Sequence, residues 1–217
     1  MPNQAIEIPA CWQDLGLRDY QETLELQRAL CEKRQQGFIE DTLLLVEHPD
    51  VITLGRKASS QQNVLETSIP VVEIERGGDV TYHGPGQLVG YPILLLREPE
   101  RDLHAYLRLL EQALIEVCAA VGVQGERRPN FTGVWIGDRK VASIGIAVRR
   151  WVTLHGFALN VATDLSCFSA IHPCGLDASV MTSLSEAAGR SITVEQIKPQ
   201  MVAALGSALH RHFGFHS

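Results

Sequence analysis

The stretch from Phe131 to Val161 restricts the possible folds of this chain more than any other part of its sequence. It consists of short apolar segments, and the polar run "IGDRK" separates "GVW" from "VASIGIAV" where a tight turn is expected. The segment "WVTLHGFALNV" then continues the same pattern. Strands joined by tight turns pair antiparallel, because parallel neighbours need long crossover connections. The sequence therefore predicts an antiparallel meander in this region.

Two longer segments ahead of the meander have the apolar spacing of helices. Residues 102 to 121 carry apolar side chains at steps of three and four, with Asp102 placed to cap the first turn and Gly122 after the last. Residues 18 to 36 carry apolar side chains near one face, and Gly37 follows as a stop. Between these helices, "TLLLVEHPDVITLG" predicts two short strands broken by a turn at residues 48 to 50.

The C-terminal part carries two competing signals for the start of a last helix. Thr193 and Gln196 fit a capping box, whereas Pro199 is unfavourable inside a helix because it lacks a backbone N–H and its ring clashes with the preceding turn. We therefore expect a short turn followed by a helix that begins at Pro199, with three residues facing the core: Met201, Leu205 and Leu209. Three histidines are then expected on one face of its fraying end rather than in a metal site: His210, His212 and His216.

The order of these elements predicts the fold class. Strands linked in runs, with helices grouped before and after them, favour an α+β sandwich over alternating βαβ units. A chain of 217 residues with 45% hydrophobic and 20% charged residues is typical of one globular domain with a sizeable core. The sequence has no internal repeat, low-complexity tract or long linker. Residues 1 to 217 are therefore predicted to form a single domain.

Charge and composition argue against several classes of function. A formal net charge of -6 is unfavourable for general nucleic-acid binding, which needs a concentrated basic surface. The apolar runs are far too short for a membrane span, and the first residues lack the basic start and apolar run of a signal peptide. The five cysteines have no Cys-x-x-Cys spacing, so a disulfide framework or a zinc site is not expected. We expect a cytoplasmic protein with reduced thiols.

One segment departs from the acidic average. Between Glu126 and Arg150 the chain has six basic and two acidic residues, a local balance of 6 - 2 = +4. Two interpretations are open: a solvated hairpin edge whose charges discourage aggregation, or a docking patch for an acidic partner. In the second interpretation, some of its arginines contact that partner: Arg127, Arg128, Arg139, Arg149 and Arg150.

Cys174 is the cysteine whose surroundings suggest chemistry. Its neighbours Pro173 and Gly175 predict a tight turn that presents the thiol away from the core, whereas Cys31 and Cys118 lie on helical stripes and are expected to fill the core. A nucleophilic cysteine needs a nearby group that favours the thiolate. Lys140, at the start of "KVASIGIAV", is a candidate, although its spacing alone favours an exposed lysine in a hairpin turn.

Several motifs, in order along the chain, give a specific resemblance. They are "RGGDVTYHGPGQLVGYP", "RKVASIGIAV", "LHGFALNV" and "HPCGL" followed by "TSL", and they run from about Arg76 to Leu184. In sequence and order they resemble the motifs of the lipoyl(octanoyl)transferases, the octanoyl-acyl-carrier-protein to protein N-octanoyltransferases. The resemblance implies the fold of biotin and lipoate protein ligase catalytic domains, an α+β arrangement of a mixed, largely antiparallel sheet with helices packed on one side.

The resemblance also implies roles for individual residues. The catalytic residues would be Cys174, Lys140 and His83. Cys174 would be the acyl-accepting thiol and Lys140 would lower the pKa of that thiol. His83 would face the reacting centre, where it could exchange protons or orient the thiol. Three segments would line the acyl-substrate site, and their residues are Arg76, Gly77, Gly78, Asp79, Val80, Thr81, Tyr82 and His83, then Ser143, Ile144 and Gly145, then Gly156, Phe157 and Ala158.

Some of these residues have other interpretations. Gly77 and Gly78 would let the main chain approach a ligand closely, since a side chain there would occupy the same space. His83 is equally typical of a core histidine hydrogen-bonded within a sheet, and Arg76 of an ion pair at the end of a strand. His155 lies in a matched motif but is expected to support the site from behind.

The implied reaction is acyl transfer in two steps. The Cys174 thiolate would take an octanoyl group from the phosphopantetheine thioester of octanoyl-acyl carrier protein, and a lysine amine of a lipoyl domain would then take it from the enzyme. The implied acceptors are lipoyl domains of 2-oxoacid dehydrogenase E2 subunits and the glycine cleavage H protein. Neither ATP nor a metal or other cofactor is expected.

Two other functions compete with this one. An ATP-dependent lipoate or biotin ligase could have the same fold. Such a ligase activates its acid as an adenylate and needs no thiol. It also needs a phosphate-binding loop, for which "GRKASSQQ" is the nearest but a poor match. A non-catalytic module that binds carrier proteins or lipoyl domains would use the basic segment and leave Cys174 incidental. An octanoyl adduct on Cys174 would separate the three.

Overall fold

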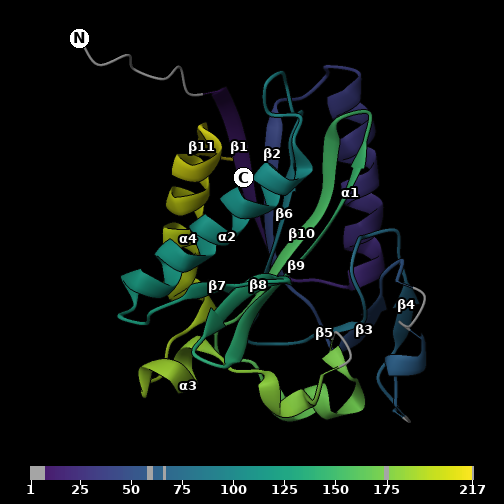
Figure 1. Cartoon of the computed structure of the whole chain (residues 1–217). Coiled ribbons are helices and arrows are strands. Elements are labelled where there is room, and N and C mark those ends of the chain that lie inside the picture. Colours follow the sequence, from purple (N-terminus) through teal and green to yellow (C-terminus); the bar gives the residue numbers. More distant parts are fainter. Residues whose placement is uncertain (1–7, 58–60, 66, 174–175, 217) are drawn as a thin grey trace.

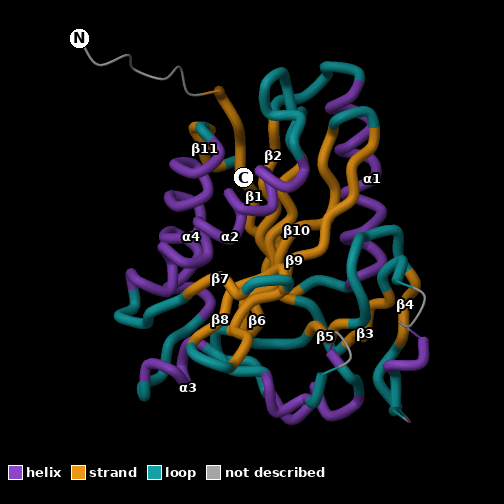
Figure 2. The backbone as a smooth tube through the Cα atoms, viewed as in Figure 1, coloured by secondary structure: helices purple, strands orange, loops and turns teal. Residues whose placement is uncertain are grey.

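The computed structural model describes residues 8–57, 61–65, 67–173 and 176–216. Its centre is an eight-stranded sheet in the order β11-β1-β2-β6-β10-β9-β8-β7 (Figures 1 and 2). The strands are β1 (Ile8–Leu17), β2 (Asp41–Glu47), β6 (Gln87–Ile93), β7 (Glu126–Arg128), β8 (Phe131–Ile136), β9 (Arg139–Arg149), β10 (Val152–Asn160) and β11 (Arg211–Phe215). β1 is parallel to β11 and β2, and every other pair is antiparallel. The predicted mixed, largely antiparallel sheet and its β8–β10 meander are confirmed.

Helices cover both faces of this sheet, not one side only as expected. Helices α2 (Leu103–Ala120) and α4 (Val194–Leu209) pack on one face, and α1 (Tyr20–Gln35) packs on the other (Figure 1). In β2, Leu43 and Leu45 join the core under α2 and α4, whereas Leu44 and Val46 join the core under α1. A strand covered on both faces has no exposed positions, which explains the unbroken apolar run "LLLV".

The two helices predicted before the meander are confirmed. The Asp102 side chain accepts hydrogen bonds from the backbone N–H groups of His104 and Ala105, and Gly122 follows α2 with a φ of +82°. The two strands expected in "TLLLVEHPDVITLG" both form, but they belong to different sheets. β3 (Val51–Leu54) is the central strand of a three-stranded sheet with β4 (Val71–Glu73) and β5 (Thr81–His83).

The predicted start of the last helix is wrong. α4 begins at Val194, where the expected capping box forms at Thr193, and it continues through Pro199. Pro199 and Glu195, four residues before it, are both exposed, so water can replace the hydrogen bond that the proline cannot make. Burial of the opposite helix face then holds the helix together, and the three predicted core residues, Met201, Leu205 and Leu209, are indeed buried.

The end of the chain also differs from the prediction. His210 ends α4 in a left-handed conformation, and residues 211 to 215 form β11 rather than a fraying helix. β11 pairs with β1, which adds two strands that carried no clear sequence signal. No group of three or more metal-ligating side chains occurs in the described part of the chain.

Short elements complete the chain. Within the described ranges they include the helix α3 (Leu184–Ala188) and 3-10 turns at Gln61–Asn63, Leu165–Ala170 and Ala178–Val180. Among the described residues, no helix combines the length and the apolar character that crossing a membrane requires.

Candidate active site

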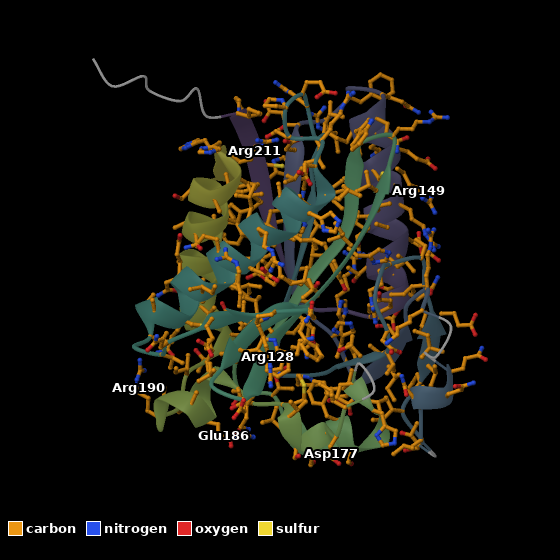
Figure 3. All side chains as sticks on the ribbon, viewed as in Figure 1. Arg128, Arg149, Asp177, Glu186, Arg190 and Arg211 are labelled. Carbon is orange, nitrogen blue, oxygen red and sulfur yellow. The ribbon has the colours of Figure 1, made fainter. Side chains whose placement is uncertain are left out.

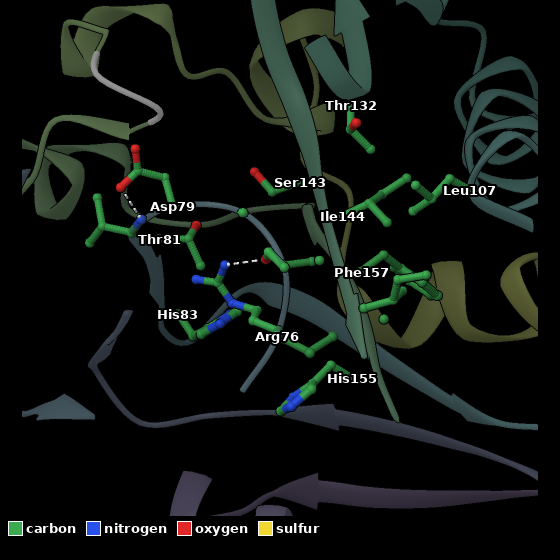
Figure 4. Close-up of a pocket in the computed structure, with 18 of the residues that line it drawn as sticks. Arg76, Asp79, Thr81, His83, Leu107, Thr132, Ser143, Ile144, His155 and Phe157 are labelled. Atoms are coloured by element: carbon green, nitrogen blue, oxygen red, sulfur yellow. Dashed lines mark hydrogen bonds between the residues drawn. The ribbon is translucent and has the colours of Figure 1, made fainter. Parts of the chain in front are cut away.

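A cavity of about 360 Å³ lies where one strand of the large sheet stops. β8 pairs with β9 only as far as Ala142, and no strand of the described residues continues along that edge of β9 beyond it. The loop after β4 lies along that edge instead, because the Gly77 N–H donates to the Ile146 carbonyl at 2.8 Å. The cavity therefore lies between a strand edge, this loop and the β7–β8 hairpin (Figure 4).

Nearly all the described residues predicted for the substrate site lie on the wall of this cavity. They are Arg76, Gly77, Gly78, Asp79, Val80, Thr81, His83, Lys140, Ser143, Ile144, Gly145, Gly156, Phe157 and Ala158. Tyr82 does not line it. Alternate side chains of a strand point in opposite directions, so β5 directs Thr81 and His83 toward the cavity and Tyr82 away from it. The Tyr82 hydroxyl instead donates to Asp50 at 2.7 Å.

Glycines allow the loop to lie this close to the strand. A Cβ atom at Gly145 would be 2.9 Å from both the Arg76 Cδ atom and the Gly77 carbonyl oxygen. Gly78 has a φ of +88°, which side-chain-bearing residues rarely adopt. The Gly-rich sequence is thus required by backbone geometry at the cavity wall, whatever the cavity binds.

Lys140 is a buried residue of β9 and not an exposed lysine in a turn. Its relative exposure is 5%, and its Nζ atom lies 5.9 Å from the centre of the Trp135 ring. Gly133 in β8 makes room for it, because a Cβ atom there would be 2.8 Å from the Lys140 Cε atom. The Lys140 carbonyl accepts from the Thr182 N–H at 3.0 Å, which brings the segment around residue 182 beside the lysine.

Cys174 lies outside the described residues, so its pairing with Lys140 stays a prediction. The thiols of Cys31 and Cys118 are buried, as expected for residues that fill the core. Burial raises the pKa of Cys118 to about 12, which disfavours the reactive thiolate. Cys11 and Cys167 are partly buried.

His83 is held neutral in a buried hydrogen-bond chain. Burial and the neighbouring His48 lower its pKa to about 3. The Gln87 amide N–H group donates to the Tyr82 carbonyl and to Asn160, so its oxygen faces His83 and accepts from Nδ1–H at 2.8 Å. The other ring nitrogen, Nε2, is then an acceptor, and the Thr53 hydroxyl lies 3.4 Å from it. The interpretation as a hydrogen-bonded core histidine is therefore confirmed in geometry, although the residue also faces the cavity.

Arg76 and Asp79 fix the loop. The Arg76 guanidinium donates to the Thr53 carbonyl and hydroxyl, both at 3.0 Å, and to the Gly77 carbonyl at 3.1 Å. Asp79 accepts from the Asn63 amide and from the Val80 N–H, and forms an ion pair with Lys57 at 3.0 Å. Burial alone would raise the pKa of Asp79, but these hydrogen bonds lower it below its ordinary value.

Sequence reasoning missed several residues of the wall. Tyr20 comes from α1, Tyr91 from β6 and Leu107 from α2, and their apolar spacing indicated only core packing. His155 also lines the cavity, with 1% exposure and a φ of +58°. Burial lowers its pKa to about 4, and its Nε2 atom lies 3.8 Å from the Glu75 carboxylate.

Most arginines of the basic segment form ion pairs within the chain. Arg127 pairs with the buried Glu111, Arg139 with Glu186 and Arg149 with Glu75. Arg128 lies 3.7 Å from the exposed Asp138 carboxylate, is 42% exposed in its side chain, and stacks on Trp135 and on Phe131, which lines the cavity. Figure 3 places Arg149 at the other end of the β9–β10 hairpin from Arg128.

Comparison with known proteins relates this arrangement to a family. Residues 19–206 match the lipoyl protein ligase A/B catalytic domain. An octanoyltransferase of Syntrophotalea carbinolica is 53% identical over 196 residues, which cover 90% of this chain and 92% of that protein. An octanoyltransferase of Geobacter sulfurreducens is 53% identical over 190 residues, covering 88% and 80%.

A solved structure supports the fold. A putative lipoate protein ligase from T. acidophilum with bound lipoic acid superposes with a TM-score of 0.78, covering 96% of this chain and 89% of that one. At 15% identity, this likeness concerns the fold alone. It confirms the predicted likeness to ligase catalytic domains.

Proposed function

Because this chain belongs to the lipoyl protein ligase A/B catalytic-domain family, as one of its octanoyltransferases, we propose that it transfers an octanoyl group through a thioester on Cys174. The donor is octanoyl-acyl carrier protein and the acceptor is a lysine of a lipoyl domain. The observation that carries this mechanism is the buried Lys140, which lies on the wall of a cavity that also has an apolar end. A thiolate near an ammonium and a pocket for an acyl tail are what the chemistry needs.

In the first step, the Cys174 thiolate attacks the thioester carbonyl. A new carbon–sulfur bond forms, and the phosphopantetheine thiolate leaves and takes a proton from the Lys140 ammonium, which becomes a neutral amine. One thioester replaces another, so the free energy changes little. The Lys140 ammonium stabilises the attacking thiolate.

In the second step, the ε-amine of the acceptor lysine attacks the acyl-enzyme. An amide forms, the Cys174 thiolate leaves, and the ammonium proton must go to a base because only a neutral amine is nucleophilic. His83, with a pKa of about 3, is a weak base at neutral pH. Lys140, neutral after the first step, is therefore the better acceptor for that proton, which returns it to the ammonium.

The octanoyl tail occupies the apolar end of the cavity. Leu107, Ile144 and Phe157 line this end, while Arg76, Asp79 and His83 lie on the other side (Figure 4). About 0.8 kcal/mol for each buried methylene gives on the order of 5 kcal/mol for a tail of roughly seven carbons. This energy holds the acyl group while the protein partners exchange.

The protein partners are the acyl carrier protein and the lipoyl domains of 2-oxoacid dehydrogenase E2 subunits and of the glycine cleavage H protein. Both kinds of partner are acidic, so contact needs local basic groups on a chain with net charge -6. Arg128 is a candidate for this contact, because its half-exposed side chain stacks on Phe131, which lines the cavity. Neither ATP nor a metal takes part in the proposed reaction.

Mass spectrometry tests this proposal. The protein is mixed with octanoyl-acyl carrier protein without ATP, and we expect one octanoyl adduct on Cys174 that disappears when a lipoyl domain is added. The Cys174→Ser variant should form no thioester and lose transfer, whereas Cys11→Ser, in β1 between β11 and β2 and away from the cavity wall, should behave as wild type. Transfer that requires ATP, or full transfer by Cys174→Ser, would contradict the mechanism.

A further inference from the structure

The apolar end of the cavity is bounded by side chains from three elements. Leu107 of α2, Ile144 of β9 and Phe157 of β10 lie together there (Figure 4). Phe157 is the largest of them and is only 3% exposed. The position of its ring therefore affects how deep the apolar end is.

A glycine on the neighbouring strand fixes that ring. Phe157 is directly opposite Gly90 in the antiparallel β6–β10 pair. A Cβ atom at position 90 would lie within 2.9 Å of three atoms of the Phe157 ring. Side chains on directly opposite residues share one face of a sheet, so the ring fills the space that a side chain at position 90 would occupy.

The ring has one direction in which to move if that space is filled. Phe157 belongs to the densely packed core under α2 and α4. Leu159 of the same strand and Leu88 of the adjoining strand β6 belong to this core too. Protein cores contain few voids, so a displaced ring cannot enter them without disturbing many neighbours. The cavity that Phe157 lines is the adjoining open space, and a larger residue at position 90 must push the ring into it.

We propose that the Phe157–Gly90 pair sets the acyl-chain length that this site accepts. The ring, lying over Gly90, forms the surface against which the end of the acyl tail packs. This inference rests on the proposed function, because it assumes that the apolar end holds the tail. A pocket distinguishes chains that differ by one methylene by roughly 10- to 200-fold, so a small movement of the ring is measurable.

Two variants move this surface in opposite directions. Gly90→Ala pushes the ring into the cavity and should lower the octanoyl-to-hexanoyl ratio of kcat/KM by about 10-fold or more. Phe157→Leu removes the ring and should raise the decanoyl-to-octanoyl ratio by a similar factor. Gly214→Ala is the matched control, because it adds the same methyl group to a strand where the nearest atom is 3.9 Å away.

The variants are compared with hexanoyl-, octanoyl- and decanoyl-acyl carrier protein, and in parallel by calorimetric titration with free hexanoate, octanoate and decanoate. Opposite shifts in chain-length preference for the two variants, with none for Gly214→Ala, would support the inference. If wild type transfers octanoyl groups and both variants keep its preference, the inference fails and the proposed function stands. If wild type forms no acyl-enzyme, the proposed function fails. The affinities for the three free fatty acids then decide whether the Phe157–Gly90 pair sets the chain length that the cavity accepts.

Discussion

Replacing Gly133 with alanine is expected to remove most of the transfer activity while leaving a folded protein. Gly133 lies in β8 with a φ of +128°, a conformation almost restricted to glycine. A Cβ atom there would lie 2.8 Å from the Lys140 Cε atom and even closer to the Ala142 carbonyl oxygen. Alanine therefore forces either the lysine or the edge of β9 to move.

The expected size of the effect has two parts. The unfavourable φ costs on the order of 1–3 kcal/mol of stability, whatever its surroundings. The clash with the Lys140 side chain also displaces its ammonium group. A displacement of about 1 Å in a group of catalytic residues can lower the reaction rate on the order of 100-fold. We therefore expect the acylation rate of Gly133→Ala to fall by about 100-fold, beyond any loss of folded protein.

Gly137→Ala separates the two parts. Gly137 is in the adjacent β8–β9 turn with a φ of +57°, but a Cβ atom there would have no neighbour within 4 Å. Thermal midpoints and single-turnover formation of the octanoyl-enzyme are measured for both variants. Gly137→Ala should lose stability and keep its rate per folded molecule. Equal rates for the two variants would refute the idea that Gly133 exists to make room for Lys140.

Three further outcomes are expected. The pKa of His83 is lowered from 6.5 to about 3 on folding, so the unfolded chain binds more protons between these two pH values. His83 should therefore contribute up to about 1.4 kcal/mol per pH unit to the loss of stability as the pH falls from 6.5 toward 3, and His83→Gln should reduce the slope measured by urea titration accordingly. Pro199→Ala should raise the free energy of unfolding by roughly 1–3 kcal/mol, since it restores a helix hydrogen bond, and an unchanged thermal midpoint would contradict this. Arg128→Glu should slow transfer most at low salt, because the lost attraction acts on association, whereas Arg150→Glu in the turn after β9 should have little effect.

The parts of the fold that were predicted correctly are those with local signals. The helix at residues 102 to 121 and the meander depend on periodicity and turn residues within a short window. The parallel pairing of β1 with β11 joins the two ends of the described chain, and nothing within either segment specifies it. Pro199 was misjudged because its local cost is outweighed by a capping box and by burial of the opposite helix face.

The same distinction applies to the candidate site. Gly145 and Lys140 were found because their motifs resemble those of a family, and the structure adds why glycine is needed there. The opening of the cavity depends on where β8 stops pairing with β9, a property of the sheet and not of one segment. Tyr20 and Leu107 line the cavity from helices whose apolar spacing is satisfied by core packing, so sequence alone could not single them out.

The protonation states in the cavity explain why an acyl-enzyme here would react with an amine rather than with water. Water is a weak nucleophile and needs a general base with a pKa near the working pH. The two histidines on the wall, His83 and His155, have pKa values lowered to about 3 and about 4, so they are poor bases for water. A lysine amine, once neutral, needs no such help. In the proposed mechanism, burial of these imidazoles would therefore remove two candidate bases for hydrolysis of the octanoyl-enzyme.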